Sequence, residues 1–202
     1  MGDECPWLVV GLGNPDAEYA GTRHNVGAVA VERLAAALGT KLRTSKLRAH
    51  LADLRQEGAR ILLARPRCYM NESGGPVCEL VRYFKVPPER LVVLHDDMDL
   101  PLGRLQIRRG GGTAGHKGLA DIASALGTRE FCRIRLGIGR PPGRKDSVDF
   151  VLSVFARSEQ EAVDVMVETA VQAVRDLVRA GLETAQNSYN ALPGEDAKAP
   201  PP

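Results

Sequence analysis

The sequence predicts a single α/β domain with a mixed, mostly parallel central sheet flanked by helices. Strand-like and helix-like segments alternate along the chain, which is the element order of α/β folds. Two strand-like segments, residues 7–12 and 91–94, are almost wholly apolar, as expected for parallel strands that are covered on both faces. With 202 residues and no internal repeat or interior linker, the chain fits one domain with a substantial core.

The first predicted strand, residues 7–12, is followed by a turn at residues 13–16 and then by a helix. Thr22 is expected to cap the N-terminus of this helix, and Gly39 is expected to end it. One face of the helix is apolar, because four apolar residues recur at four-residue spacing. These residues are Val26, Ala30, Leu34 and Leu38.

The middle of the chain contains three further predicted strands and one helix. Residues 49–54 and 60–64 are strands joined by a turn at residues 57 and 58. Ser73 can cap a helix that runs to about Phe84 and stops before two prolines. The apolar strand at residues 91–94 then leads directly into the sequence His95-Asp96-Asp97-Met98-Asp99.

The last third of the chain continues this alternation. Residues 104–109 have the apolar–polar alternation of a half-buried strand. The glycines at 110–112 form a loop before a helix at residues 116–126, and residues 133–138 form the last strand. The final helix begins with a capping box and ends at a glycine. The box is formed by Ser158 and Glu161, the apolar face by Val163, Val167, Val171, Val174 and Val178, and the stop by Gly181.

We expect residues 7–190 to form the domain, between an N-terminal extension of residues 1–6 and a disordered tail of residues 191–202. No segment approaches the roughly 20 apolar residues that span a bilayer, and the N-terminus lacks a signal pattern. The four cysteines lie far apart, without a Cys-x-x-Cys pair, and fit reduced structural thiols. These features predict a cytoplasmic protein with no membrane association.

The net charge of +2 conceals an uneven distribution of charge. Between Arg104 and Lys145 there are ten basic residues and two acidic ones, a local balance of +8. Such a surplus suggests that a polyanion docks on this region. A solvated, Arg-rich sheet edge explains the same charges equally well, so charge alone leaves both interpretations open.

Polar residues follow the predicted strands at the places where open α/β sheets bind ligands. Asn14 follows the first strand, His24 precedes the next helix, Asn71 precedes another, and Asp96 ends the strand at residues 91–94. A His and an Asp at one rim of the sheet can act as a general base and the group that orients it. Two nearby amides can donate hydrogen bonds to a developing oxyanion. Individually, each residue also fits a turn, a cap or a structural role.

Three other kinds of site fit the sequence less well. Gly11-Leu12-Gly13 follows a strand, but Asp16 occupies the position of the third glycine in a dinucleotide-binding motif. Asp96, Asp97 and Asp99 resemble a metal cluster, but the other histidines lack ligand spacing, so we expect no metal. No Gly-x-Ser-x-Gly motif is present, which disfavours a serine hydrolase.

Several separated motifs resemble those of bacterial-type peptidyl-tRNA hydrolases and occur in the same order. They are Val10-Gly11-Leu12-Gly13-Asn14-Pro15, Tyr19, Thr22-Arg23-His24-Asn25-Val26-Gly27, Tyr69-Met70-Asn71-Glu72-Ser73-Gly74, His95-Asp96-Asp97-Met98-Asp99-Leu100-Pro101-Leu102-Gly103, Gly115-His116-Lys117-Gly118 and Arg135-Leu136-Gly137-Ile138-Gly139. The likeness extends over nearly the whole chain, from about Trp7 to Asn190.

The resemblance implies a monomer without an obligate protein partner, metal or cofactor that hydrolyses the ester between peptide and tRNA. It implies that His24 activates water and Asp96 orients His24. By the same likeness, Asn14, Met70 and Asn71 position the substrate. The residues implied to contact the acceptor stem and 3′ end of the tRNA are Tyr19, Tyr69, Asn71, Lys117, Arg135, Arg140, Arg144 and Lys145.

Two positions depart from the family pattern. Asp16 stands where the family usually has Gly, in the loop that carries Asn14. Lys117 stands where the family usually has Asn, and a lysine can bind phosphate but cannot accept a hydrogen bond. The main rival to an enzyme is a non-enzymatic RNA-binding protein on the same fold, like the organellar splicing factors related to this family. The presence of His24 and Asp96 favours the enzyme, because binding alone needs no activated base.

Overall fold

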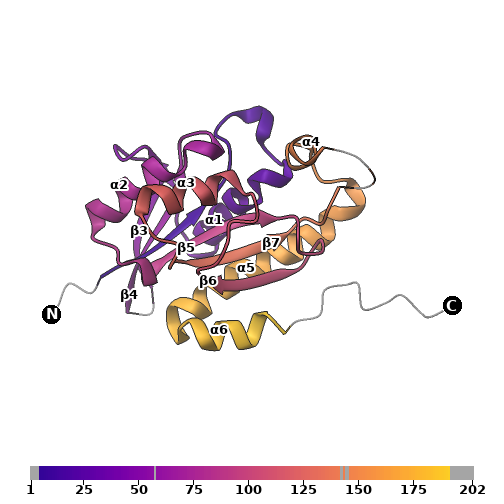
Figure 1. Ribbon diagram of the computed structural model, residues 1–202. Coiled ribbons are helices and arrows are strands. Elements are labelled where there is room, and N and C mark those ends of the chain that lie inside the picture. The colour runs from indigo at the N-terminus through magenta and orange to yellow at the C-terminus, as the bar shows by residue number, and fades with distance from the viewer. Residues whose placement is uncertain (1–4, 57, 142, 144–145, 192–202) are drawn as a thin grey trace.

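A sheet of seven strands lies at the centre of the computed structural model, which describes residues 5–56, 58–141, 143 and 146–191 (Figure 1). The strands lie in the order β2-β3-β4-β1-β5-β7-β6. Their bounds are Trp7–Gly11 for β1, Arg43–Thr44 for β2, Ala49–Gln56 for β3, Ala59–Pro66 for β4, Leu91–Asp97 for β5, Leu105–Arg109 for β6 and Cys132–Gly137 for β7. The four central strands, β4, β1, β5 and β7, are parallel, and the outer strands pair antiparallel with their neighbours. The predicted mixed sheet is confirmed.

Helices cover both faces of this sheet (Figure 1). Their bounds are Val26–Ala37 for α1, Gly74–Phe84 for α2, Lys117–Leu126 for α3, Ser147–Val151 for α4, Gln160–Ala180 for α5 and Leu182–Tyr189 for α6. Helices α2 and α3 pack together on one face, and α1 and α5 pack on the other. Helix α6 lies along β6, where the side chain of Gln186 donates to the carbonyl of Ile107 at 3.2 Å.

The apolar side chains of β1 belong to two hydrophobic clusters, one on each side of the sheet. Leu8 and Val10 belong to the cluster under α2 and α3, whereas Val9 belongs to the cluster under α1 and α5. All three side chains are fully buried. Burial of each such side chain contributes about 1.5–3 kcal/mol. This two-sided burial explains why the strand has no polar alternation.

The start of α1 is held unusually close to the sheet. A Cβ at Gly27 would lie 2.2 Å from the carbonyl oxygen of Leu94 on β5, and a Cβ at Gly11 would lie 2.3 Å from the carbonyl oxygen of Gly27. The N–H of Ala28 also donates to the carbonyl of Leu12 at 2.8 Å. Side chains at either glycine would push the helix away. The two glycines therefore fix the segment before α1 against the carboxyl ends of β1 and β5.

At three predicted helix starts, the expected side-chain cap does not form. A short 3-10 turn, Arg23–Asn25, precedes α1, so Asn25 takes the cap position, while the hydroxyl of Thr22 donates to the carbonyl of Tyr19 at 2.8 Å. At α2, the hydroxyl of Ser73 donates backwards to Met70, and the carboxylate of Asp121 on α3 accepts the N–H of Gly74 at 2.6 Å. A distant carboxylate has replaced the local cap.

The capping box predicted for Ser158 and Glu161 is also wrong. Helix α5 begins at Gln160 after a 3-10 turn, and the carboxylate of Glu159 accepts the backbone N–H of Ala156 at 2.6 Å. The predicted stops are confirmed, because Gly39 and Gly181 both have positive φ, 68° and 84°, directly after their helices.

The structure tests the expectations about the number of elements, membrane spans and chain ends only in part. The elements β2, α4 and α6 were not predicted from the sequence. Among the helices in the described part of the chain, none is long and apolar enough to cross a membrane. Most of the predicted N-terminal extension, residues 1–4, and of the predicted tail, residues 192–202, lies outside the described residues.

Candidate active site

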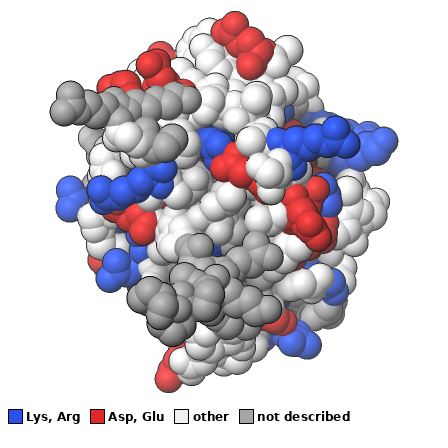
Figure 2. Space-filling model, turned by 90° about the vertical axis from the view of Figure 1, so that its right-hand side faces the viewer, with Lys and Arg blue, Asp and Glu red and all other residues white. Residues whose placement is uncertain are grey.

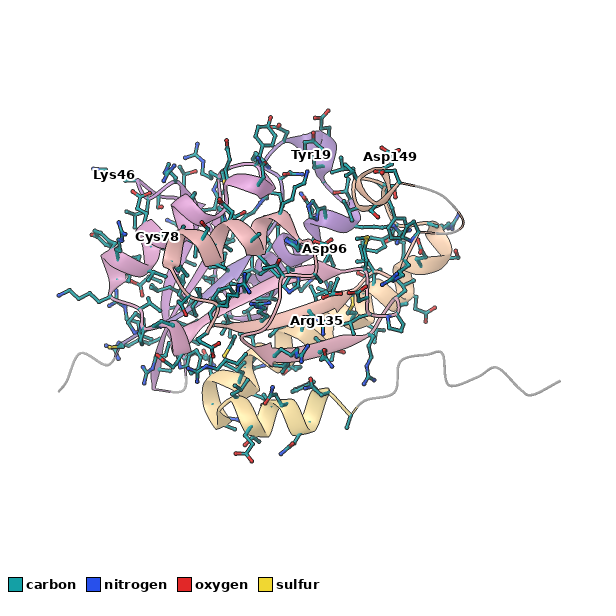
Figure 3. The ribbon with its side chains drawn as sticks, viewed as in Figure 1. Tyr19, Lys46, Cys78, Asp96, Arg135 and Asp149 are labelled. Carbon is teal, nitrogen blue, oxygen red and sulfur yellow. The ribbon has the colours of Figure 1, made fainter. Side chains whose placement is uncertain are left out.

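A cavity of about 320 Å³ opens at the carboxyl ends of β1 and β5. It brings together eight of the residues that the sequence singled out, from six separate segments. These are Asn14, Tyr19, His24, Tyr69, Met70, Asn71, Asp96 and Lys117. In Figure 3, Tyr19 lies at the upper rim of this end of the molecule, with Asp96 below it at the level of the sheet. The cavity therefore lies where open α/β sheets usually bind ligands, at the carboxyl ends of the strands.

His24 and Asp96 form the pair that the sequence predicts. The Nδ1 atom of His24 lies 2.8 Å from Oδ1 of Asp96, although the two residues are 72 positions apart. His24 comes from the 3-10 turn before α1, and Asp96 comes from the end of β5. The close packing of α1 on β5 at Gly27 accounts for this meeting. The Asp96 side chain is 3% exposed and the His24 side chain 12%, so the pair is largely shielded from water.

His116 is a third member of this cluster, and no role for its side chain was predicted from the sequence. Its Nε2 lies 3.0 Å from Oδ1 of Asp96, the same oxygen that binds His24. Its Nδ1 accepts the backbone N–H of Leu119 at 3.2 Å and so caps α3. Because Nδ1 accepts, the ring proton belongs on Nε2, where it is donated to Asp96. In the sequence, the feature that could have indicated a role for His116 is its position in the Gly-His motif, directly before a helix.

The tautomer of His24 follows from the same oxygen. An ionised Asp96 only accepts hydrogen bonds, so Nδ1 of His24 carries its ring proton and donates it to Asp96. The Nε2 atom of a neutral His24 then holds a free lone pair. A histidine can act as a base only through a ring nitrogen that has such a free lone pair.

The charge of Asp96 is stabilised despite its burial. Burial by itself would raise the pKa of a carboxyl group, but attraction to His116 and the hydrogen bonds from His116 and His24 outweigh it. The pKa of Asp96 is therefore held below its ordinary value. Asp96 remains ionised at neutral pH and is available to stabilise a positive charge on His24.

His95 supports the cluster from behind. Its ring meets the ring of His116 edge-on, with centroids 5.0 Å apart, and its Nδ1 donates to the carbonyl of Asp96 at 2.7 Å. Burial lowers the pKa of His95, and the neighbouring His116 lowers it further. His95 is therefore neutral and acts as packing, not as a second base.

Asn14 has a fixed orientation at the cavity wall. Its side-chain oxygen accepts the backbone N–H of Met70 at 2.8 Å, so the amide nitrogen is the free end. Its own backbone N–H donates to the side chain of Asn25 at 2.8 Å, and its carbonyl accepts from the Asn25 amide nitrogen at 3.0 Å. Asn14 is thereby a rigid donor facing the cavity. Asn14 therefore lines the cavity with its amide nitrogen unbonded within the described residues.

The mouth of the cavity carries exposed aromatic and polar side chains. Tyr69 is 48% exposed, and its hydroxyl donates to the carboxylate of Asp16 at 2.7 Å. This bond raises the pKa of Tyr69. Asn71 is exposed on the 3-10 turn Met70–Glu72, and Lys117 is exposed at the first position of α3. The departure at Asp16 therefore has a structural use, because it orients Tyr69.

Apolar side chains form another part of the cavity wall. Helix α4 and the residue after it contribute Val148, Val151 and Leu152, and the end of β5 is followed by Met98. Figure 3 shows Asp149 of α4 beside Tyr19 at the upper rim in this view. Val148, Val151 and Leu152 were not predicted to line the site, because α4 was not predicted. The cavity thus has a polar part at His24 and an apolar part at α4.

The basic residues are partly neutralised by neighbouring acids. Arg135 on β7 binds Asp97 at 2.7 Å, and Arg140 binds Asp99 at 2.6 Å. A second cavity of about 300 Å³ shares Asp97 and Asp99 with the first and is lined by Arg108, Arg133 and Arg135. Figure 2 shows exposed basic and acidic side chains next to one another on this end of the molecule. Arg144 and Lys145 lie outside the described residues.

These ion pairs also bear on the resemblance of Asp96, Asp97 and Asp99 to a metal cluster. Asp97 and Asp99 face arginines, whereas Asp96 faces histidines. The three carboxylates therefore do not act as one group.

Comparisons with known proteins agree with the site. The family model described as "Peptidyl-tRNA hydrolase" matches residues 8–199. A peptidyl-tRNA hydrolase of Nocardia farcinica is 52% identical over 186 residues, which cover 92% of this chain and 96% of the relative. One of Frankia alni is 48% identical over 190 residues, covering 94% and 96%.

A solved structure has the same fold. The crystal structure of peptidyl-tRNA hydrolase from Acinetobacter baumannii matches with a TM-score of 0.87 and 35% identity, covering 95% of this chain and 97% of that one. Sequence, fold and site agree over nearly the whole length, and the chain therefore belongs to the peptidyl-tRNA hydrolase family.

Proposed function

We propose that this chain hydrolyses the ester bond between peptide and tRNA in peptidyl-tRNA, with His24 as general base and Asp96 as its orienting group. The observation that carries the proposal is the 2.8 Å hydrogen bond between Nδ1 of His24 and the buried Asp96. It leaves Nε2 of His24 free to take a proton from water. A positioned general base typically accelerates such a step about 10²–10⁴-fold.

The reaction then proceeds in two proton transfers. Nε2 of His24 takes a proton from a water molecule as its oxygen attacks the ester carbonyl, and Asp96 stabilises the imidazolium that forms. The tetrahedral intermediate collapses by breaking the bond to the ribose oxygen, which receives the proton from His24. Free tRNA and the peptide carboxylate are the products.

The amides at the cavity stabilise the negative charge that develops on the carbonyl oxygen. Asn14 presents its NH₂ group, because Met70 N–H already holds its oxygen. Asn71 supplies a second amide at the same cavity. One such donor typically contributes about 10²–10³-fold to turnover. Met70, which is buried and bonded to Asn14, sets the distance between these two groups.

The tRNA end enters beside two tyrosines, of which Tyr69 is exposed and Tyr19 is partly exposed. Tyr69 and Tyr19 line the mouth of the cavity and offer ring faces on which unpaired bases stack. Lys117, Arg135 and Arg140 supply positive charge for phosphates of the acceptor stem, together with Arg144 and Lys145 beyond them in the sequence. The apolar wall at Val148, Val151 and Leu152 accommodates the peptide side chain next to the ester.

We infer that one chain is sufficient for this activity in the cytoplasm. All the groups named for the chemistry come from a single chain and meet in one cavity. No step needs a protein partner or a cofactor. In the cell the reaction would recycle stalled peptidyl-tRNA.

The rival function is RNA binding without catalysis, and it requires a different set of side chains at the site. Binding requires the tyrosines and basic residues but does not require a buried carboxylate to orient a histidine. Asp96 is held ionised at 3% exposure by two histidine donors, and such an arrangement costs desolvation that a binding protein has no reason to keep. This observation favours the enzyme.

One assay separates the two functions. An N-blocked amino acid esterified to tRNA is incubated with the protein, and unblocked aminoacyl-tRNA serves as the control. Release of the blocked amino acid, with little release of the unblocked one, supports the proposal. Tight binding of both tRNAs without release contradicts it and supports the rival.

A further inference from the structure

The cluster of His24, Asp96 and His116 has the composition of a transition-metal site. Among the residues that the structure describes, these three form a group whose potential ligand atoms all lie within 4.8 Å of one another. Nδ1 of His24 and Nε2 of His116 lie 2.8 and 3.0 Å from the same carboxylate oxygen. Around a tetrahedral Zn²⁺, with bonds of about 2.0–2.2 Å, ligand atoms lie roughly 3.4 Å apart. Small movements of the two rings would therefore admit an ion.

We propose that His24, Asp96 and His116 bind Zn²⁺, or a similar borderline divalent transition metal, and that the bound ion inhibits the enzyme. Two imidazoles and one carboxylate are the ligands that zinc prefers, and the adjoining cavity has room for water as the fourth ligand. Mg²⁺ prefers six oxygen ligands, so it does not compete for this site.

Inhibition follows from the position of the ring protons. In the metal-free cluster, His24 carries its proton on Nδ1 and keeps Nε2 free as the base. When Nδ1 donates its lone pair to zinc, the proton of the neutral ring moves to Nε2. The ring neither gains nor loses a proton in total. However, Nε2 of His24, which would accept the proton from water, is now itself protonated. This consequence rests on the proposed role of His24, whereas the binding site rests on geometry alone.

The ion has to displace contacts that stabilise the fold. Coordination by Nε2 of His116 moves that ring's proton to Nδ1, which then can no longer accept the N–H of Leu119. The cap of α3 is lost as a result, and this loss opposes zinc binding. A chelator should therefore restore the metal-free enzyme.

Titration calorimetry of the full chain with ZnCl₂, and separately with MgCl₂, tests the site directly. The test variant is His116→Asn, because asparagine removes the metal ligand yet is itself a good helix cap, so α3 stays capped. The controls are His50→Gln, a histidine of β3, and Cys5→Ser and Cys68→Ser, which remove two thiols that could bind zinc elsewhere. Circular dichroism checks that each variant is folded.

We expect one Zn²⁺ per chain, no Mg²⁺ binding, and the same Zn²⁺ affinity in the three controls. In His116→Asn the affinity should fall by at least about tenfold, since even groups that only orient metal ligands contribute 10–100-fold. Absence of Zn²⁺ binding, or equal binding by His116→Asn, overturns the site. If zinc occupies the site as expected but wild-type hydrolysis continues, the inhibition is wrong. If the metal-free protein hydrolyses nothing, the proposed function fails while calorimetry still decides on the site.

Discussion

The side-chain oxygen of Asn14 accepts the backbone N–H of Met70 at 2.8 Å, across 56 residues of sequence. The bond joins the loop after β1 to the 3-10 turn before α2, and both segments line the cavity. It also decides which end of the Asn14 amide is free, because an oxygen that accepts a backbone donor leaves the NH₂ group available at the cavity.

Asn14→Asp should therefore reduce turnover of peptidyl-tRNA about 10²–10³-fold, the usual effect of losing one oxyanion donor. The aspartate keeps the acceptor for Met70 N–H and nearly the same shape, so the cavity should stay intact. Single-turnover kinetics and a thermal melt measure the two effects. A variant with wild-type turnover would show that the Asn14 amide nitrogen does not contact the reacting ester.

His24→Ala should lower kcat by about 10²–10⁴-fold, because it removes the base. Binding of tRNA and the fold should change little, since the His24 side chain is small and lies at the rim of the sheet. Steady-state kinetics together with filter binding test both statements, with His50→Ala as the matched control. Near-normal turnover in His24→Ala would remove His24 from the mechanism.

Asp96→Asn should lower turnover less than the loss of His24 does. The carboxylate orients His24 and stabilises the imidazolium that forms, so its removal weakens the proposed base but leaves it in place. Single-turnover kinetics on both variants measure the difference. A larger loss in Asp96→Asn than in His24→Ala would mean that Asp96 does more than orient His24.

The same substitution should also change how stability depends on pH. The pKa of Asp96 is lowered in the folded protein, so the ionised carboxylate contributes stability above its ordinary pKa, and this contribution is lost as the pH falls through the lowered value. Relative to Asp96→Asn, the wild type should be more stable at pH 7, and its advantage should shrink in strong acid. Urea midpoints at pH 7 and pH 3 measure the difference.

Lys117→Ala should raise KM for peptidyl-tRNA more than it lowers kcat, whereas Lys117→Asn should be tolerated. An ammonium group has three donors and no acceptor, so it can hold a phosphate oxygen but cannot receive a hydrogen bond from the attacking water. A raised KM at constant kcat supports this role. A large fall in kcat at constant KM would place Lys117 in the chemical step instead.

Arg140→Glu should weaken tRNA binding and reduce the slope of log Kd against log salt by about 1 or more, because fewer counterions are released. Arg140 is exposed and paired with Asp99, so its reversal should not disturb the core. Hydrolysis of a short model ester is the control and should be unchanged. An unaltered salt slope would show that the tRNA docks on another surface.

Periodicity and strand ends were enough to predict most of this fold. The apolar runs of β1 and β5 identified the centre of a parallel sheet, and the positions of His24 and Asp96 beside those strands predicted that the two side chains would meet. Helix ends marked by Gly39 and Gly181 were also readable, because a glycine with positive φ is a local signal.

Contacts between distant segments could not be read in the same way. Ser73 looked like a cap, but Asp121 from α3 takes that role because it approaches in space and not in sequence. His116 joined the cluster for the same reason, since its ring reaches Asp96 only after α3 has packed on the sheet. Helix α4 is five residues long, too short for a helical period to appear in its sequence.

Arg23 precedes His24 in the sequence. Its guanidinium lies between the rings of Phe150 and Phe155, at 4.5 and 4.7 Å from their centroids, and it pairs with Glu159 at 2.6 Å. The turn that carries His24 is therefore fastened by residues that are synthesised more than a hundred positions later. While Phe150, Phe155 and Glu159 of a growing chain are still inside the ribosome, Arg23 lacks these contacts, even when β1, β4 and β5 have already paired. The contacts that hold Arg23, and with it the turn of His24, can therefore form only near the end of the synthesis of the chain.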